Sequence, residues 1–190
     1  MAHRKRGVLS MTRLSGQMRA KRLIFDPKSL QMEKRTAMNT AADQARFEKE
    51  ILLKTPQPRV WQALTDTRQF GAWFQARIDT PFAVGQAATG QMLVPGFEHL
   101  KLHLTVERLQ PERLFSFRWH PYVIEPGVDY STEATTLVEF MLDAVGGDTL
   151  LTVAESGFDQ LPAARQAEAY RMESRGWAQQ LENIKAFVKA

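Results

Sequence analysis

The chain has 190 residues, of which 44% are hydrophobic, and it contains no cysteine. This length suits one domain of ordinary size, and no stretch approaches the roughly 18 consecutive apolar residues that a transmembrane helix needs. The lack of cysteine excludes disulfides, thiolate nucleophiles and cysteine-ligated zinc, and it fits a cytoplasmic protein in a reducing compartment.

The net charge of +4 is distributed unevenly along the chain. Residues 1–42 contain ten Lys or Arg and two acidic residues, whereas the remainder contains 15 basic and 19 acidic residues. The basic character therefore belongs to the N-terminal segment. It gives no reason to expect nucleic-acid binding by the rest of the chain, which we expect to form one domain over residues 43–190.

Residues 1–42 show no sustained helix or strand period, and their apolar islands are too short to form a core. Three interpretations stay open. In the first, translation begins at Met38 and the basic leader is an upstream start-site artefact. In the second, the leader is a disordered tail that contacts nucleic acid or another acidic surface. In the third, this Arg-rich, acid-poor segment is an organelle transit peptide.

The first elements of the domain are predicted to be a strand and two short helices. Residues 47–54 alternate in polarity like a strand, and Pro56 and Pro58 end it. Apolar residues then recur at helical spacing through Thr65. Asp66 is placed to cap a second helix over about 67–74, whose apolar side carries Phe70, Trp73 and Phe74.

The period then falls to two, which predicts a run of antiparallel strands. Short strands are expected at 76–80 and around 91–94, and a clear half-buried strand at 100–106. Phe115, Phe117 and Trp119 alternate with polar residues in the next. After a loop through 121–127, strands at 135–144 and 149–156 are joined by a tight turn at Gly146-Gly147-Asp148.

The last predicted element is a helix of about 28 residues that begins at Pro162. Its apolar positions form one stripe, and a helix of this length needs a broad partner, which only the sheet provides. We therefore predict an α+β fold: a curved antiparallel sheet of about six or seven strands, covered on one face by the long helix. The stripe consists of Tyr170, Ser174, Trp177, Leu181, Ile184 and Val188.

This order of elements, with five local strings, resembles the START-like superfamily, also called SRPBCC or helix-grip. The most similar subfamily is that of the C-terminal domain of the heat-shock-protein-90 ATPase activator. The resemblance implies a helix-grip fold. It leaves the function open, because members bind lipids, hormones or polyketides, catalyse cyclisation, or contact a chaperone. The strings are residues 59–66 with Trp73-Phe74, residues 111–117, residues 136–140, residues 148–153 with 155–158, and Gly176-Trp177 with Leu181.

A ligand cavity is the main functional expectation, because a long helix over a curved sheet does not fill the interior. Glu155 shares a strand face with Leu151 and Val153, which points its carboxylate at the helix. There it would orient a polar ligand group, pair with Arg171 or Arg175, or reach solvent; we favour one of the last two. The expected ligand-binding residues are Trp73, Phe74, Phe115, Phe117, Trp119, Glu155, Tyr170 and Trp177.

Other chemistry has less support in the sequence. His99 and His103 would lie about 13 Å apart along a strand, which does not suit a shared metal. His120 lies at a strand end before Pro121, which favours a place at the surface or loop edge. No nucleophile–histidine–acid order or phosphate-binding glycine pattern is present.

We therefore predict no cofactor, no metal and no catalytic residue. The expected function is binding of an apolar or amphipathic small molecule between the last helix and the sheet. A chaperone-associated module that binds a protein partner is the first alternative. A cyclase- or hydrolase-like enzyme is the second, and Glu155 is the one residue we can name for it.

Overall fold

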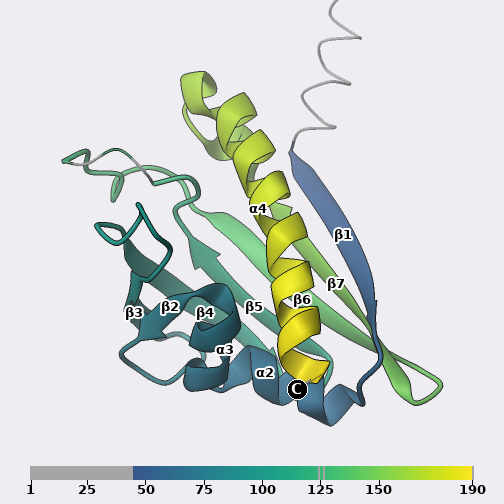
Figure 1. Ribbon diagram of the computed structural model, residues 1–190. Coiled ribbons are helices and arrows are strands. Elements are labelled where there is room, and N and C mark those ends of the chain that lie inside the picture. The colour runs from purple at the N-terminus through teal and green to yellow at the C-terminus, as the bar shows by residue number, and fades with distance from the viewer. Residues whose placement is uncertain (1–44, 124, 126, 190) are drawn as a thin grey trace, which may run out of the picture.

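The computed structural model describes residues 45–189 apart from 124 and 126, so the expectations for residues 1–42 lie outside the described residues. Within these described residues, seven strands form one antiparallel sheet, and four helical segments accompany it (Figure 1). The elements are β1 (Arg46–Leu53), α2 (Gln57–Thr65), α3 (Thr67–Phe74), β2 (Ala76–Ile78), β3 (Ala87–Met92), β4 (Lys101–Gln110), β5 (Leu114–Trp119), β6 (Thr136–Val145), β7 (Asp148–Ser156), η1 (Phe158–Gln160) and α4 (Ala163–Lys189).

The strands lie in the order β1-β7-β6-β5-β4-β3-β2, and each pairs with its neighbours in antiparallel orientation. Consecutive strands from β2 to β7 are adjacent, which is the usual arrangement for strands that follow one another along the chain. The helices α2 and α3 carry the chain from β1 at one edge to β2 at the other. A register shift between Val106 and Arg108 interrupts the β4–β5 ladder, and such a bulge bends the strand that carries it.

The helix α4 crosses one face of the sheet over its whole length (Figure 1). Four members of the predicted stripe, Trp177, Leu181, Ile184 and Val188, are buried against the sheet and α2. Tyr170 and Ser174 are half-buried. The predicted contact between helix and sheet is therefore confirmed, with its tightest part in the C-terminal half of α4.

Local signals in the sequence explain how the short helices are placed. The Asp66 side chain accepts hydrogen bonds of 3.0 Å from the backbone N–H groups of Arg68 and Gln69, which is the predicted cap of α3. The Trp73 indole N–H donates to the carbonyl oxygen of Ala63 at 2.8 Å and so joins α3 to α2. These helices close the end of the core under the C-terminal half of α4.

The inward faces of the strands follow the expected alternation. Leu102, Leu104 and Val106 of β4 are buried, while their neighbours Lys101 and His103 are exposed. In β6 the inward set is Val138, Phe140 and Leu142, so Glu139 lies on the outer face. Within the described residues, no helix is long and apolar enough to cross a membrane.

Candidate functional site

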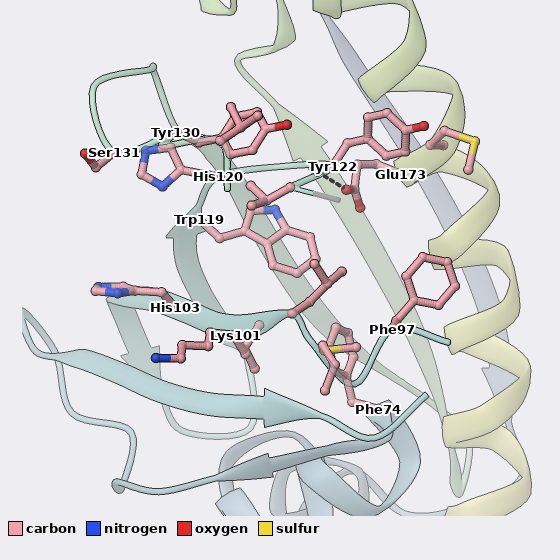
Figure 2. Close-up of a pocket in the computed structure, with 16 residues that line it drawn as sticks. Phe74, Phe97, Lys101, His103, Trp119, His120, Tyr122, Tyr130, Ser131 and Glu173 are labelled. Atoms are coloured by element: carbon pink, nitrogen blue, oxygen red, sulfur yellow. Dashed lines mark hydrogen bonds between the residues drawn. The ribbon is translucent and has the colours of Figure 1, made fainter. Parts of the chain in front are cut away.

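A cavity of about 490 Å³ lies beside the N-terminal half of α4 (Figure 2). Its walls come from the inner sides of β4 and β5, the end of α3, the segment 92–100, the loop 120–131 and α4 itself. It lies away from the tightly packed C-terminal half of α4. The lining residues are Phe74, Met92, Phe97, Leu100, Lys101, Leu102, His103, Trp119, His120, Tyr122, Val123, Val128, Tyr130, Ser131, Met172 and Glu173.

The walls are largely apolar and rich in aromatic rings. Phe74 and Trp119 form the deep side, where their ring centroids are 6.2 Å apart. Apolar side chains also reach the mouth, where Phe97 is 44% exposed, Val128 47% and Met172 38%. An apolar cavity with an apolar rim is suited to a ligand that arrives with little polar surface.

Few polar side chains face this cavity. Lys101 and His103 belong to the exposed face of β4, and Figure 2 shows both side chains pointing away from Trp119 and the other inward rings. Both residues therefore belong to the lining because β4 passes along the cavity, and not because their side chains enter it. Polar groups that reach the interior come instead from the loop 120–131 and from Glu173 of α4.

Glu173 brings a carboxyl group to the upper wall of the cavity. Its Oε1 accepts a 2.7 Å hydrogen bond from the backbone N–H of Tyr122 (Figure 2). Burial of the carboxyl and the nearby charge of Glu155 raise the pKa of Glu173 well above its ordinary value, although the Tyr122 N–H opposes the shift. The cavity thus holds an acid that resists ionisation.

Besides the hydrogen bonds that Tyr122 gives to Glu173 and Glu168, the side chain of Arg165 ties α4 to the loop 120–131. Its guanidinium pairs with Glu133 and donates to the carbonyl oxygens of Pro121 and Tyr122 at 2.9 and 2.8 Å. It also lies over the Tyr130 ring at 4.3 Å. Tyr122 itself has a φ of 51°, in the left-handed region that residues other than glycine rarely adopt. These contacts hold Pro121, Tyr122 and Tyr130 against the N-terminal part of α4.

Glu155 lies behind the cavity wall and is fully buried. Its Oε1 accepts hydrogen bonds from the Trp119 indole N–H at 2.8 Å and from the Thr136 hydroxyl at 2.6 Å. Its Oε2 accepts one from the Trp177 indole N–H at 2.7 Å. Burial raises the pKa of Glu155 to about 7, against the lowering effect of these three donors.

The inward direction predicted for Glu155 is confirmed, but the pairing that we favoured for it is wrong. No arginine of the described residues contacts its carboxylate, and the side chain is fully buried. Arg171 instead lies on the exposed side of α4, 4.0 Å from Glu168. The physical reason is that the periodic pattern of aromatic residues predicts only an apolar surface. It does not indicate that indole N–H groups will donate hydrogen bonds to this carboxylate.

The expected ligand-binding residues fall into three groups. Phe74 and Trp119 line the cavity. Tyr170 packs against Phe47 and Phe158, with ring centroids 5.6 and 5.5 Å away, and does not line it. The others support the wall from behind, in the core or through the Glu155 hydrogen bonds: Trp73, Phe115, Phe117, Trp177 and Glu155.

Sequence reasoning missed Glu173 and the loop residues. A signal for Glu173 existed, since it is three residues after Tyr170 and four before Trp177, which places it on the apolar stripe of α4. Nothing in the periodicity pointed to Tyr122, Val128 or Tyr130, because the loop has no regular period.

A metal site finds no support in the part of the chain that the structure describes, since no group of three His, Asp or Glu side chains gathers there. His120, expected at a loop edge, is half-buried at the cavity wall, and its Nε2 lies 3.2 Å from the carbonyl oxygen of Glu133.

Glu155→Gln is expected to destabilise the protein by about 1–3 kcal/mol, because in either orientation the amide N–H₂ meets an indole N–H, which can only donate. The loss in free energy of unfolding should be larger at pH 5 than at pH 8. Folding raises the pKa of Glu155 from 4.5 to about 7, so the wild-type protein loses stability as pH rises through that interval. The amide of the variant does not titrate, so the variant does not lose stability in this way. Urea unfolding at both pH values measures this. Glu139→Gln, on the outer face, is the control, and an equal loss at both pH values would contradict the prediction.

Arg165→Met should loosen the loop 120–131 while changing global stability less. The variant removes the partner of Glu133 and leaves two loop carbonyl oxygens without their donor. Hydrogen–deuterium exchange of the loop amides should accelerate by about tenfold or more. Arg171→Met is the matched control, since its ion pair with Glu168 is exposed. Unchanged exchange in the Arg165 variant would show that the loop is held by other contacts.

Comparisons with known proteins agree with this architecture. The family model described as "Activator of Hsp90 ATPase homolog 1-like protein" matches residues 54–189. Among the curated proteins, none matches the chain. Several solved structures share the fold, and because their identities to this chain are below 25%, the likeness bears on the fold alone.

Protein MLL2253 from Mesorhizobium loti is 22% identical with a TM-score of 0.60, over 76% of this chain and 96% of that one. Protein CV1439 from Chromobacterium violaceum is 17% identical with a TM-score of 0.58, over 77% and 98%. A protein from Arthrobacter aurescens is 18% identical with a TM-score of 0.61, over 77% and 87%. The family match spans every element from α2 to α4, and the chain therefore belongs to the family of activator of Hsp90 ATPase homolog 1-like proteins, within the START-like superfamily.

Proposed function

We propose that this protein binds one apolar or amphipathic small molecule in the cavity between α4 and the inner faces of β4 and β5. The observation that carries the proposal is the cavity itself, whose volume of about 490 Å³ falls within the range of small-molecule sites. Its lining supports the same function, because Phe74, Leu102 and Trp119 offer apolar surface and contain no competing charge.

The arrangement of the entrance also supports a small ligand. Phe97, Val128 and Met172 belong to three separate segments and are all exposed at the rim. A ligand that entered between them would remove their apolar surface from water, at about 25 cal/mol for each Å² buried. On either side of Val128, Arg165 of α4 donates to the carbonyl oxygens of Pro121 and Tyr122 and lies over the Tyr130 ring, which supports a rim that needs little ordering on binding.

Filling the cavity tests this function with a matched pair of variants. The probe is the neutral dye 6-propionyl-2-(dimethylamino)naphthalene, whose emission shifts to the blue in apolar surroundings. Leu100→Trp places an indole in the cavity lining and should weaken saturable binding by about tenfold or more. Leu93→Trp, at a 53% exposed position outside the lining, should leave binding unchanged. Equal binding by both variants would place the dye elsewhere and contradict the proposal.

A protein partner is the second candidate function, and the exposed apolar rim is the observation that favours it. In this interpretation the rim of Phe97, Val128 and Met172 contacts a chaperone, as the description of the family suggests. The purified protein should then raise the ATPase rate of Hsp90 from the same organism. Phe97→Ser should abolish the stimulation and Leu100→Trp should leave it intact. An unchanged ATPase rate with the wild-type protein would remove this candidate.

A further inference from the structure

Within the cavity lining, Glu173 is the only residue that carries a carboxyl group. Its Oε1 is occupied by the backbone N–H of Tyr122 at 2.7 Å. The second oxygen, Oε2, has no hydrogen-bond partner among the described residues. Figure 2 shows the carboxyl group reaching from α4 toward the loop, above the Trp119 ring. One carboxyl oxygen of Glu173 is therefore bonded to the protein, and the other is available to a ligand.

No cation of the described residues neutralises Glu173. On α4, Arg165 is paired with Glu133, and Arg171 lies near Glu168. On β4, the side chains of Lys101 and His103 point away.

The other groups around Glu173 include no cation paired with it. From the loop, Tyr122 offers its backbone N–H, and its hydroxyl donates to Glu168 at 3.2 Å. His120 lies against the Glu133 carbonyl oxygen. From β7, Glu155 brings a second carboxyl group beneath the wall. These surroundings favour a neutral acid at position 173 over a carboxylate.

A neutral carboxylic acid in an apolar site acts as a hydrogen-bond donor. Because Oε1 already accepts from the Tyr122 N–H, the acid proton belongs on Oε2. Burial and the charge of Glu155 raise the pKa of Glu173, which agrees with this assignment. The donor then faces a cavity in which the neighbouring walls are aromatic or aliphatic.

We propose that the Oε2–H group of Glu173 donates a hydrogen bond to an acceptor oxygen of the ligand, so that the cavity selects neutral, mostly apolar molecules that carry a carbonyl group. This inference rests on the proposed binding function and specifies its ligand class. Carboxylate ligands such as fatty-acid anions are disfavoured, because an anion would lose its hydration in this apolar cavity and would meet no paired cation among the described residues. Hydrocarbons of the same shape are accepted, but they leave the acid proton without a partner.

Four naphthalenes of similar size test the ligand class by isothermal titration calorimetry. They are 2-acetylnaphthalene, its hydrocarbon analogue 2-isopropylnaphthalene, the cation 2-(aminomethyl)naphthalene and the anion 2-naphthoate. At pH 6 the ketone should bind about tenfold more tightly than the hydrocarbon, the value of one good hydrogen bond in an apolar site. The ketone's advantage should disappear as pH rises through the ionisation of Glu173, while the affinity of the hydrocarbon stays constant.

Two substitutions at one position separate the donor from the shape of the site. Glu173→Gln keeps an acceptor for the Tyr122 N–H and a neutral donor toward the cavity, so it should keep the ketone's advantage and lose its pH dependence. Glu173→Leu should lose the advantage and still bind the hydrocarbon. His120→Asn removes the one imidazole that faces the site, and it should leave the pH dependence in place.

The possible outcomes separate the inference about Glu173 from the proposed binding function on which it rests. If the hydrocarbon binds and the ketone binds no better, the role of Glu173 is overturned and the binding function stands. If the amine binds most tightly and its affinity grows with pH, Glu173 acts as a carboxylate and the ligand class is overturned. If none of the four naphthalenes binds to the wild-type protein, both proposals fail. Should Glu173→Leu not fold, the wild-type comparison between ketone and hydrocarbon still decides.

Discussion

One buried carboxyl group, shared by two indoles, is the directional interaction within the otherwise apolar contact between α4 and the sheet. Glu155 rises from β7, Trp119 ends β5, and Trp177 lies near the middle of α4. Each indole donates to a different oxygen, so the carboxyl group joins Trp177 of α4 to Trp119 and Glu155 of the sheet in a defined direction. A purely apolar contact would allow sliding, since hydrophobic burial has no preferred direction. The cavity lies beside this anchor, and its depth follows from where the anchor holds α4.

Most of the fold could be predicted because its signals are periodic. Alternation indicated the inward faces of β1, β4 and β5, and the helical stripe of α4 named the buried Trp177, Leu181 and Ile184. For β6 alternation was insufficient, since both faces of the strand carry apolar residues, and only the packed structure places Val138 and Phe140 inside. Periodicity identifies a face of one element; which face points inward depends on the partners that tertiary packing supplies.

The candidate site was less predictable for two physical reasons. The first is that the loop 120–131 forms much of the wall, and its conformation follows from long-range contacts such as those from Arg165 to Pro121 and Tyr122. The second is that a cavity is a volume that side chains leave unfilled, and no residue type in a sequence indicates where such a volume lies. The aromatic residues were expected at the ligand, yet Phe115 and Phe117 are fully buried in the core. Large rings in this domain mainly support the wall, and only Phe74 and Trp119 of that set reach the cavity.

Trp119 has two sides with different surroundings, and this gives the domain a mechanical property. Its ring forms part of the cavity floor, while its N–H is bonded to the carboxyl group that anchors α4. Any occupant that tilts this ring also changes the length and angle of that hydrogen bond. A ligand whose binding depended on the tilt of this ring would therefore also act on the position of α4 at Trp177, and by linkage the position of α4 would act equally on the affinity of that ligand.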